Sequence, residues 1–95
     1  MQAKVLAIVE RIVAERDRQK TLPGSEWDSK NSVNDWIAIA SHYLTQQAKR
    51  KSSSRFTRGI SLTQEDFEDD LIKAAAVILA ALEFSDTLKS NGELS

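Results

Sequence analysis

The residues best suited to chemistry lie where a predicted amphipathic helix changes character. Arg16 and Gln19 continue the apolar stripe of this helix after its aliphatic residues stop, and Glu15 lies at the edge of the stripe. An inward face that turns polar marks either the point where the helix emerges from the core or the wall of a polar pocket, and we favour emergence. In the pocket alternative, Asp28 would join these residues to hold a polar ligand such as a nucleotide.

A second group of candidates is formed by acids in a later helix. Asp66 and Asp70 are four residues apart on a helical face shared with Lys73, so the two carboxylates could contact one cation. No acid occurs in residues 36–64, so the preceding helix supplies almost no carboxylate that could complete a metal site. We therefore expect these acids to be solvated or paired with Lys73. We expect no metal site and no cofactor. If a metal such as Mg²⁺ does bind, Asp66 and Asp70 are the candidate ligands.

Other catalytic arrangements find little support. His42 is the only histidine and lies about 120° from the centre of its helix's apolar stripe, so we expect it to be exposed and not catalytic. The absence of cysteine excludes disulfides, thiol catalysis and Cys-ligated zinc. With three glycines the chain has no glycine-rich phosphate loop, and its net charge of -1 argues against a general nucleic-acid binder.

A basic segment over residues 49–60 is predicted to be a mobile loop. The functional interpretation is a phosphate-binding arm in which Phe56 stacks on a base. The favoured interpretation is a solvated loop whose charge offsets the acids downstream. Nucleic acid is therefore not the expected partner. The cations of the segment are Lys49, Arg50, Lys51, Arg55 and Arg58.

Helical periodicity supplies the elements that must position these residues. Apolar spacing predicts helices over residues 3–20 and 32–49. The intervening segment, residues 21–31, contains Pro and Gly and lacks periodicity, so it is predicted to be a loop. Trp27 in this loop is expected to be buried.

Local signals predict where the second and third helices begin. Ser32 and Asp35 have the spacing of a capping box, and Thr63 can cap the third helix. Residues 74–82 of that helix are apolar on every side, which indicates burial all round. Because two other helices can hardly cover it, we expect a homodimer in which the third helix packs against its partner.

These elements predict an all-α fold with three main helices in a bundle completed by dimerisation. The bundle is expected to be a single domain over residues 1–89, followed by a frayed tail over residues 90–95. The longest apolar run, residues 74–82, is far shorter than the roughly 20 residues that span a bilayer. The apolar start at residues 5–9 runs straight into charged residues. We therefore expect no membrane or targeting segment and a cytoplasmic location.

Three strings spread over about residues 8–86 follow one another as they do in a known family. They are Glu15, Arg16, Arg18 and Gln19 followed by Trp27 and Asp28; then Asp35 to Ile39; then Asp70 to Val77 through Glu83. They resemble the "ER-RQ … W … D", "DEWLAIL" and "ELVQVAAVAVA … E" strings of the MazG-like branch of the all-α nucleoside triphosphate pyrophosphohydrolases, especially the small phage and bacterial members.

The resemblance implies a helical, oligomeric fold that binds Mg²⁺ through an EExxE and an ExxD element and cuts nucleoside triphosphates to monophosphate and pyrophosphate. The first element corresponds to residues 42–46, which contain no carboxylate. The second corresponds to Asp70 and Lys73, and a lysine cannot ligate Mg²⁺. Since hydrolysis needs metal ions to neutralise phosphates and activate water, we expect a divergent member with the scaffold kept and the metal site largely lost.

Three functions remain open. The favoured one is a dimeric helical scaffold that binds a nucleotide or a protein partner without cleavage, with the binding candidates Glu15, Arg16, Gln19, Asp28 and Lys73. The alternative is an active pyrophosphohydrolase with Mg²⁺ in a rearranged site built from Glu15, Asp28, Asp66 and Asp70. A second alternative is nucleic-acid binding through the basic loop.

Overall fold

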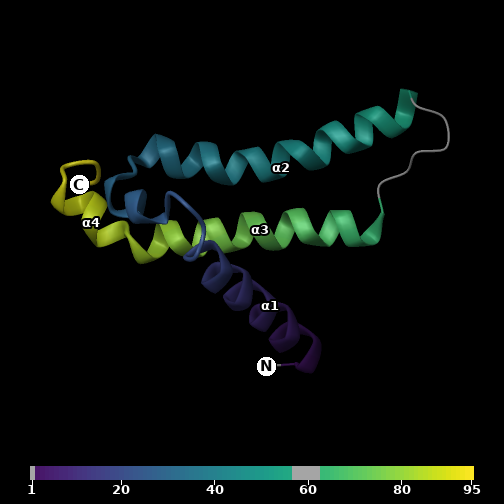
Figure 1. The fold of residues 1–95 in the computed structure, drawn as a ribbon, viewed down its shortest axis with the longest axis horizontal. Helices are drawn as coiled ribbons and strands as arrows, with labels where there is room; N and C mark the ends of the chain where they lie inside the picture. Colours follow the sequence, from purple (N-terminus) through teal and green to yellow (C-terminus); the bar gives the residue numbers. More distant parts are fainter. Residues whose placement is uncertain (1, 57–62) are drawn as a thin grey trace.

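The computed structural model of the chain describes residues 2–56 and 63–95, with side chains described in residues 2–46 and 63–95. The described residues form helices and no strand, so the predicted all-α class is confirmed (Figure 1). None of these helices is long and apolar enough to cross a membrane. The elements are α1 (Ala3–Gln19), the 3₁₀ helix η1 (Ser25–Lys30), α2 (Val33–Phe56), α3 (Gln64–Glu83) and α4 (Ser85–Ser90).

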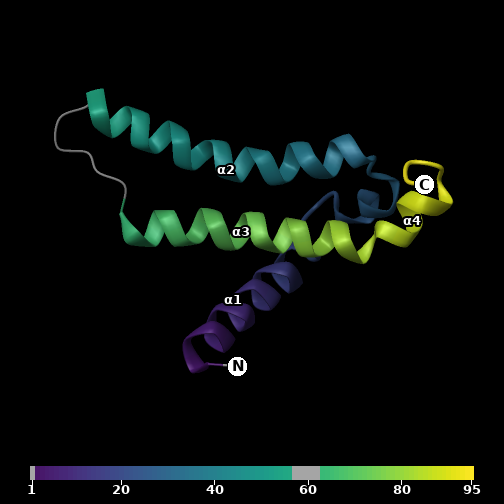
Figure 2. The ribbon, with the colours of Figure 1, turned by 180° about the vertical axis from the view of Figure 1, so that it is seen from behind.

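Helices α2 and α3 form a long antiparallel hairpin, and the C-terminal end of α1 packs across α3 (Figure 1 and Figure 2). The N-terminal end of α1 points away from the hairpin. Helix α4 lies beside the start of α2, where the Val33 N–H donates to Glu93 Oε1 at 2.9 Å. The end of α1, η1, the first half of α2 and the second half of α3 thus meet at one junction.

Hydrogen bonds confirm the predicted starts of α2 and α3. The Asp35 N–H donates to Ser32 Oγ at 3.0 Å, and the Ser32 N–H donates to Asp35 Oδ2 at 2.9 Å. This reciprocal pair is the predicted capping box. Thr63 Oγ1 accepts from the Asp66 N–H at 3.0 Å. Both caps satisfy N–H groups that have no partner within a helix, which fixes where each helix begins.

A small apolar core joins α2, α3 and α4. Its buried members are Trp36, Val77, Ala80 and Leu88. The Trp36 ring stacks on Phe84, with the ring centroids 5.7 Å apart and the planes inclined by 24°. The indole nitrogen of Trp36 is buried and has no hydrogen-bond partner within the described part of the chain.

Helix α2 is longer than predicted. It continues to Phe56 instead of ending at Lys49, because neither Gly nor Pro interrupts residues 33–56. The prediction of a basic loop over residues 49–60 is therefore wrong for residues 49–56. The remainder of that loop and the side chains of the proposed phosphate-binding arm lie outside the described residues.

The segment between α1 and α2 also differs from its prediction. It contains η1, so residues 21–31 are not a simple loop. Trp27 is 56% exposed, and the expectation that it is buried is wrong. Lys30 Nζ lies 4.5 Å from the centre of the Trp27 ring, and this cation–π contact covers one face of a ring that stays at the surface.

Residues 90–95 are predicted to be a frayed tail. In the structure, backbone hydrogen bonds tie the first part of this segment to α4. The Gly92 N–H donates to the Lys89 carbonyl at 3.1 Å, and the Glu93 N–H donates to the Leu88 carbonyl at 2.9 Å. Gly92 has a φ of 80°, which glycine adopts at little cost. Together these features form a Schellman motif that ends α4.

Substitutions at Trp36 test this core. Trp36→Phe keeps a ring to stack on Phe84 and removes the unpartnered indole N–H, so we expect the free energy of unfolding to change by less than about 1 kcal/mol. Trp36→Ala removes the ring and should cost about 3–5 kcal/mol. Urea unfolding at one protein concentration measures both, and equal losses in the two variants would contradict the stacked core.

Candidate functional site

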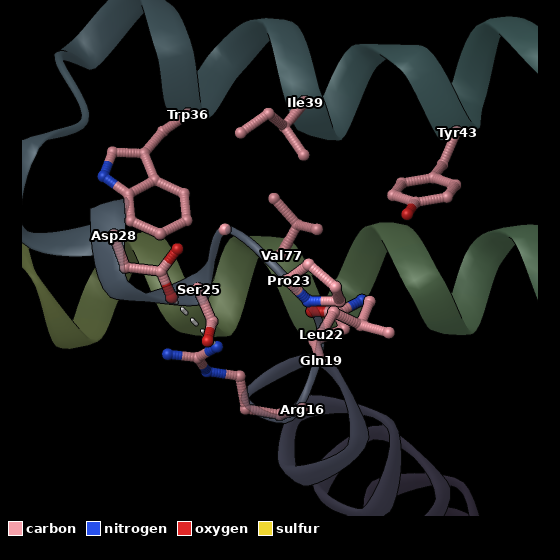
Figure 3. Close-up of a pocket in the computed structure, with 11 residues that line it drawn as sticks. Arg16, Gln19, Leu22, Pro23, Ser25, Asp28, Trp36, Ile39, Tyr43 and Val77 are labelled. Atoms are coloured by element: carbon pink, nitrogen blue, oxygen red, sulfur yellow. Dashed lines mark ion pairs between the residues drawn. The ribbon is translucent and has the colours of Figure 1, made fainter.

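A pocket of about 220 Å³ lies where the end of α1 and the loop after it meet α2 and α3 (Figure 3). One wall is polar and comes from α1, the loop and η1. The opposite wall is apolar and partly aromatic, and comes from α2, α3 and the loop. The polar wall carries Arg16, Gln19, Ser25 and Asp28, and the apolar wall carries Leu22, Pro23, Trp36, Ile39, Tyr43 and Val77.

Arg16 is the central charge of the polar wall and is only 5% exposed. Its Nε donates to Glu83 Oε1 at 3.0 Å, and its Nη1 lies 3.6 Å from Asp28 Oδ2. Because a buried guanidinium without acidic partners would be strongly destabilising, these contacts tie α1 to both η1 and α3. The favoured prediction that the helix emerges from the core at Arg16 is wrong, and a polar pocket forms there instead.

Glu15 is held beside Arg16 by residues of its own helix. Arg18 donates from Nε and Nη2 to the two carboxylate oxygens, each at 2.7 Å, and Gln19 Nε2 donates at 3.1 Å. The hydrogen bonds from Arg18 are the largest cause that lowers the pKa of Glu15. Partial burial opposes this effect, while the charge of Arg18, the hydrogen bond from Gln19 and the charge of Lys73 lower the pKa further. Glu15 is therefore a carboxylate at neutral pH.

The structure brings the five predicted binding residues to one junction but does not place them all in the pocket. Arg16, Gln19 and Asp28 line it, whereas Glu15 and Lys73 are outside its lining. Gln19 connects the two groups, because its Nε2 donates to Glu15 and also to the Lys73 carbonyl at 3.4 Å.

The predicted metal candidates lie on α3, outside the pocket lining. Asp70 is buried and Asp66 half-buried, and both interact with other groups. In residues 2–56 and 63–95, no group of three or more His, Cys, Asp or Glu side chains is arranged to hold a metal ion. His42 is exposed, as predicted, and its ring meets the edge of Tyr43 with the centroids 5.4 Å apart.

Glu83 is a site residue that the sequence reasoning did not select. It shares a helical face with Ala76 and Ala80, which are both buried. The side chain of Glu83 is 42% exposed, so the sequence carried no burial signal that paired it with Arg16. The sequence assigned Trp36 and Tyr43 to a core-facing stripe, and both also form the apolar wall of the pocket.

The two walls suit a flat polar ring better than a phosphate group. Arg16 is shared between two carboxylates, so a phosphate in the pocket would meet the charge of Asp28 as well as that of Arg16. A ring could lie against Trp36 or Tyr43 while its edge exchanges hydrogen bonds with Gln19 or Asp28.

Comparison of the chain with protein-family models, curated proteins and solved structures found no match.

Glu15→Gln tests the network beside the pocket. Since the folded protein lowers the pKa of Glu15, the carboxylate stabilises the fold above pH 4.5, the ordinary glutamate value, and this stabilisation is lost as the pH falls through the lower folded-state value. The wild type should therefore lose more unfolding free energy than Glu15→Gln as the pH falls from about 5 to about 3.

The matched control for this pH series is Glu10→Gln, which removes the same charge from an exposed position on α1. Chemical unfolding at each pH gives the two profiles. Identical pH profiles for Glu15→Gln and Glu10→Gln would contradict the network.

Proposed function

We propose that this chain is a divergent MazG-like protein, a homodimeric helical scaffold that binds the base of a nucleotide in the pocket and does not cleave the nucleotide. The observation that carries the proposal is the pairing of the two walls. Aromatic and aliphatic side chains face a guanidinium, an amide and a carboxylate across one small cavity. A nucleobase has the same division, with apolar faces and a hydrogen-bonding edge.

The size of the pocket supports a base-sized occupant. Its volume of about 220 Å³ is below the roughly 300–1,000 Å³ typical of pockets for drug-sized ligands. A base therefore fits inside, while a sugar and a chain of phosphates extend toward solvent. The charge balance around Arg16 agrees with this orientation, because the guanidinium is already paired with Asp28 and Glu83.

Binding without cleavage rests on the sequence of residues 42–46, which stand where the resembling family has its EExxE element and contain no carboxylate. Mg²⁺ takes oxygen ligands and bridges phosphates to an attacking water, so a helical segment without carboxylates supplies none of that chemistry. The acids near the pocket have other partners. Glu15 accepts hydrogen bonds from Arg18 and Gln19, and Asp28 faces Arg16.

A homodimer is part of the proposal because the single chain has a small core. Its buried apolar residues are few and mostly small: Trp36, Ala74, Ala76, Val77, Ala80 and Leu88 in the described parts of the chain. A chain of this length buries only about two-thirds of the surface that it exposes when unfolded, and a second copy would cover more of its apolar surface.

Calorimetric titration with nucleosides, nucleoside monophosphates and nucleoside triphosphates tests the binding function. Because the base lies inside and the phosphates outside, one base should bind with similar affinity in all three forms, within about threefold, and a chelator should not change that affinity. Ile39→Trp places a bulky ring in the apolar wall and should weaken binding about tenfold or more, which corresponds to about 1.4 kcal/mol.

The matched control is Ile37→Trp, which makes the same substitution on the same helix at a position that is exposed and outside the pocket lining. It should bind like the wild type. Binding that requires the γ-phosphate and Mg²⁺, or metal-dependent pyrophosphate release that is lost in Asp70→Ala, would contradict this function and favour the pyrophosphohydrolase alternative.

A further inference from the structure

One face of α3 carries large apolar side chains that the single chain leaves exposed. Phe67, Leu71, Ile78 and Leu82 are between 37% and 66% exposed, and their spacing places them on one side of the helix. Ala75, which is half-buried, and Ala74, which the chain itself already buries, lie between them. We call these six residues the α3 stripe. It extends over about 22 Å along the helix, at 1.5 Å per residue.

The α3 stripe is nearly the same when followed from either end. Its order is two large residues, two alanines and two large residues, with the midpoint between Ala74 and Ala75. When a second α3 is laid antiparallel across this midpoint, Phe67 lies opposite Leu82 of the second copy. Leu71 then lies opposite Ile78, and the alanines lie opposite each other. Such self-complementarity is what a two-fold symmetric interface requires, and the small side chain of Ala75 beside the midpoint permits close approach of the helices.

We infer that the α3 stripe is the contact surface for a second copy of this chain, packed antiparallel about a two-fold axis between Ala74 and Ala75. Charge selects the antiparallel direction. The first turns of α3 are strongly acidic, so parallel packing would bring two acidic helix starts together, whereas antiparallel packing places them at opposite ends of the interface. The acids are Glu65, Asp66, Glu68, Asp69 and Asp70.

A groove of about 490 Å³ between α1 and α3 extends the same surface. Its apolar lining includes Ile8 of α1 with Leu71 and Ile72 of α3, and its polar lining includes the Arg11–Glu68 ion pair at 2.6 Å. Leu71 belongs to both the groove and the α3 stripe. In the antiparallel dimer, the Leu82 end of the second copy therefore packs beside the groove and covers apolar surface of α1.

The interface leaves the pocket accessible. Val77 lines the pocket, and its neighbour Ile78 in the α3 stripe points about 100° away around the helix. The interface rests on the homodimer proposed above and does not rest on the ligand. A failure of nucleotide binding and a failure of this interface are therefore separate results.

Disulfide cross-linking of single-cysteine variants tests the interface, because the chain has no cysteine of its own. Ala75→Cys lies beside the two-fold axis and should give a disulfide-linked dimer on mild oxidation. Leu71→Cys and Leu82→Cys lie about 10 Å and about 22 Å along the helix from their own copies, too far to bridge, so neither should link to itself. A mixture of Leu71→Cys and Ile78→Cys proteins should link to each other.

Two matched controls complete the experiment. Ala38→Cys, on an exposed position of α2, should remain unlinked. In sedimentation, Ile78→Asp should lose the dimer, whereas Ile37→Asp, exposed on α2 outside the α3 stripe, should keep it. Self-linking of Leu71→Cys and Leu82→Cys would overturn the antiparallel register. A wild-type monomer at micromolar concentration, or a dimer that survives Ile78→Asp, would overturn the interface.

Discussion

The buried guanidinium of Arg16 is the constraint on which the junction of this chain depends. A charge that is removed from water must be surrounded by acidic partners, and α1 supplies neither of the two that Arg16 contacts. Glu83 approaches from the last turn of α3, and Asp28 approaches from η1. Because both acids must reach the same side chain, α1 has to cross α3 near the C-terminal end of α3. The segment after α1 has to fold back as a short helix.

The pocket is a consequence of this arrangement. With η1 held against Arg16, the loop before η1 lines a small cavity, and Trp36, Ile39 and Tyr43 face a polar wall across it. The acids at the junction mainly balance arginines, so the local charge is close to neutral. Such a site can distinguish the hydrogen-bonding edge of a ring, but it offers little unpaired positive charge to a chain of phosphates. These properties favour recognition of a base over phosphate chemistry.

Features set by neighbours in the sequence could be predicted, and features set by distant contacts could not. The capping box of Ser32 and Asp35 and the cap at Thr63 depend on residues three apart, and both are confirmed. Periodicity showed that the apolar stripe of α1 turns polar at Arg16. It did not show what lies opposite, because Glu83 is 67 residues away in the sequence. The approach of η1 depends on a second contact of the same side chain, the one between Arg16 and Asp28.

Arg16 is a buried, hydrogen-bonded cation, and nuclear magnetic resonance of the arginine Nε–H groups tests this property most directly. The Nε–H of Arg16 should exchange with solvent far more slowly than that of the exposed Arg11, and Glu83→Ala should remove this protection, because Glu83 Oε1 accepts that hydrogen at 3.0 Å. Exchange of the Arg16 Nε–H as rapid as that of Arg11 would contradict the account.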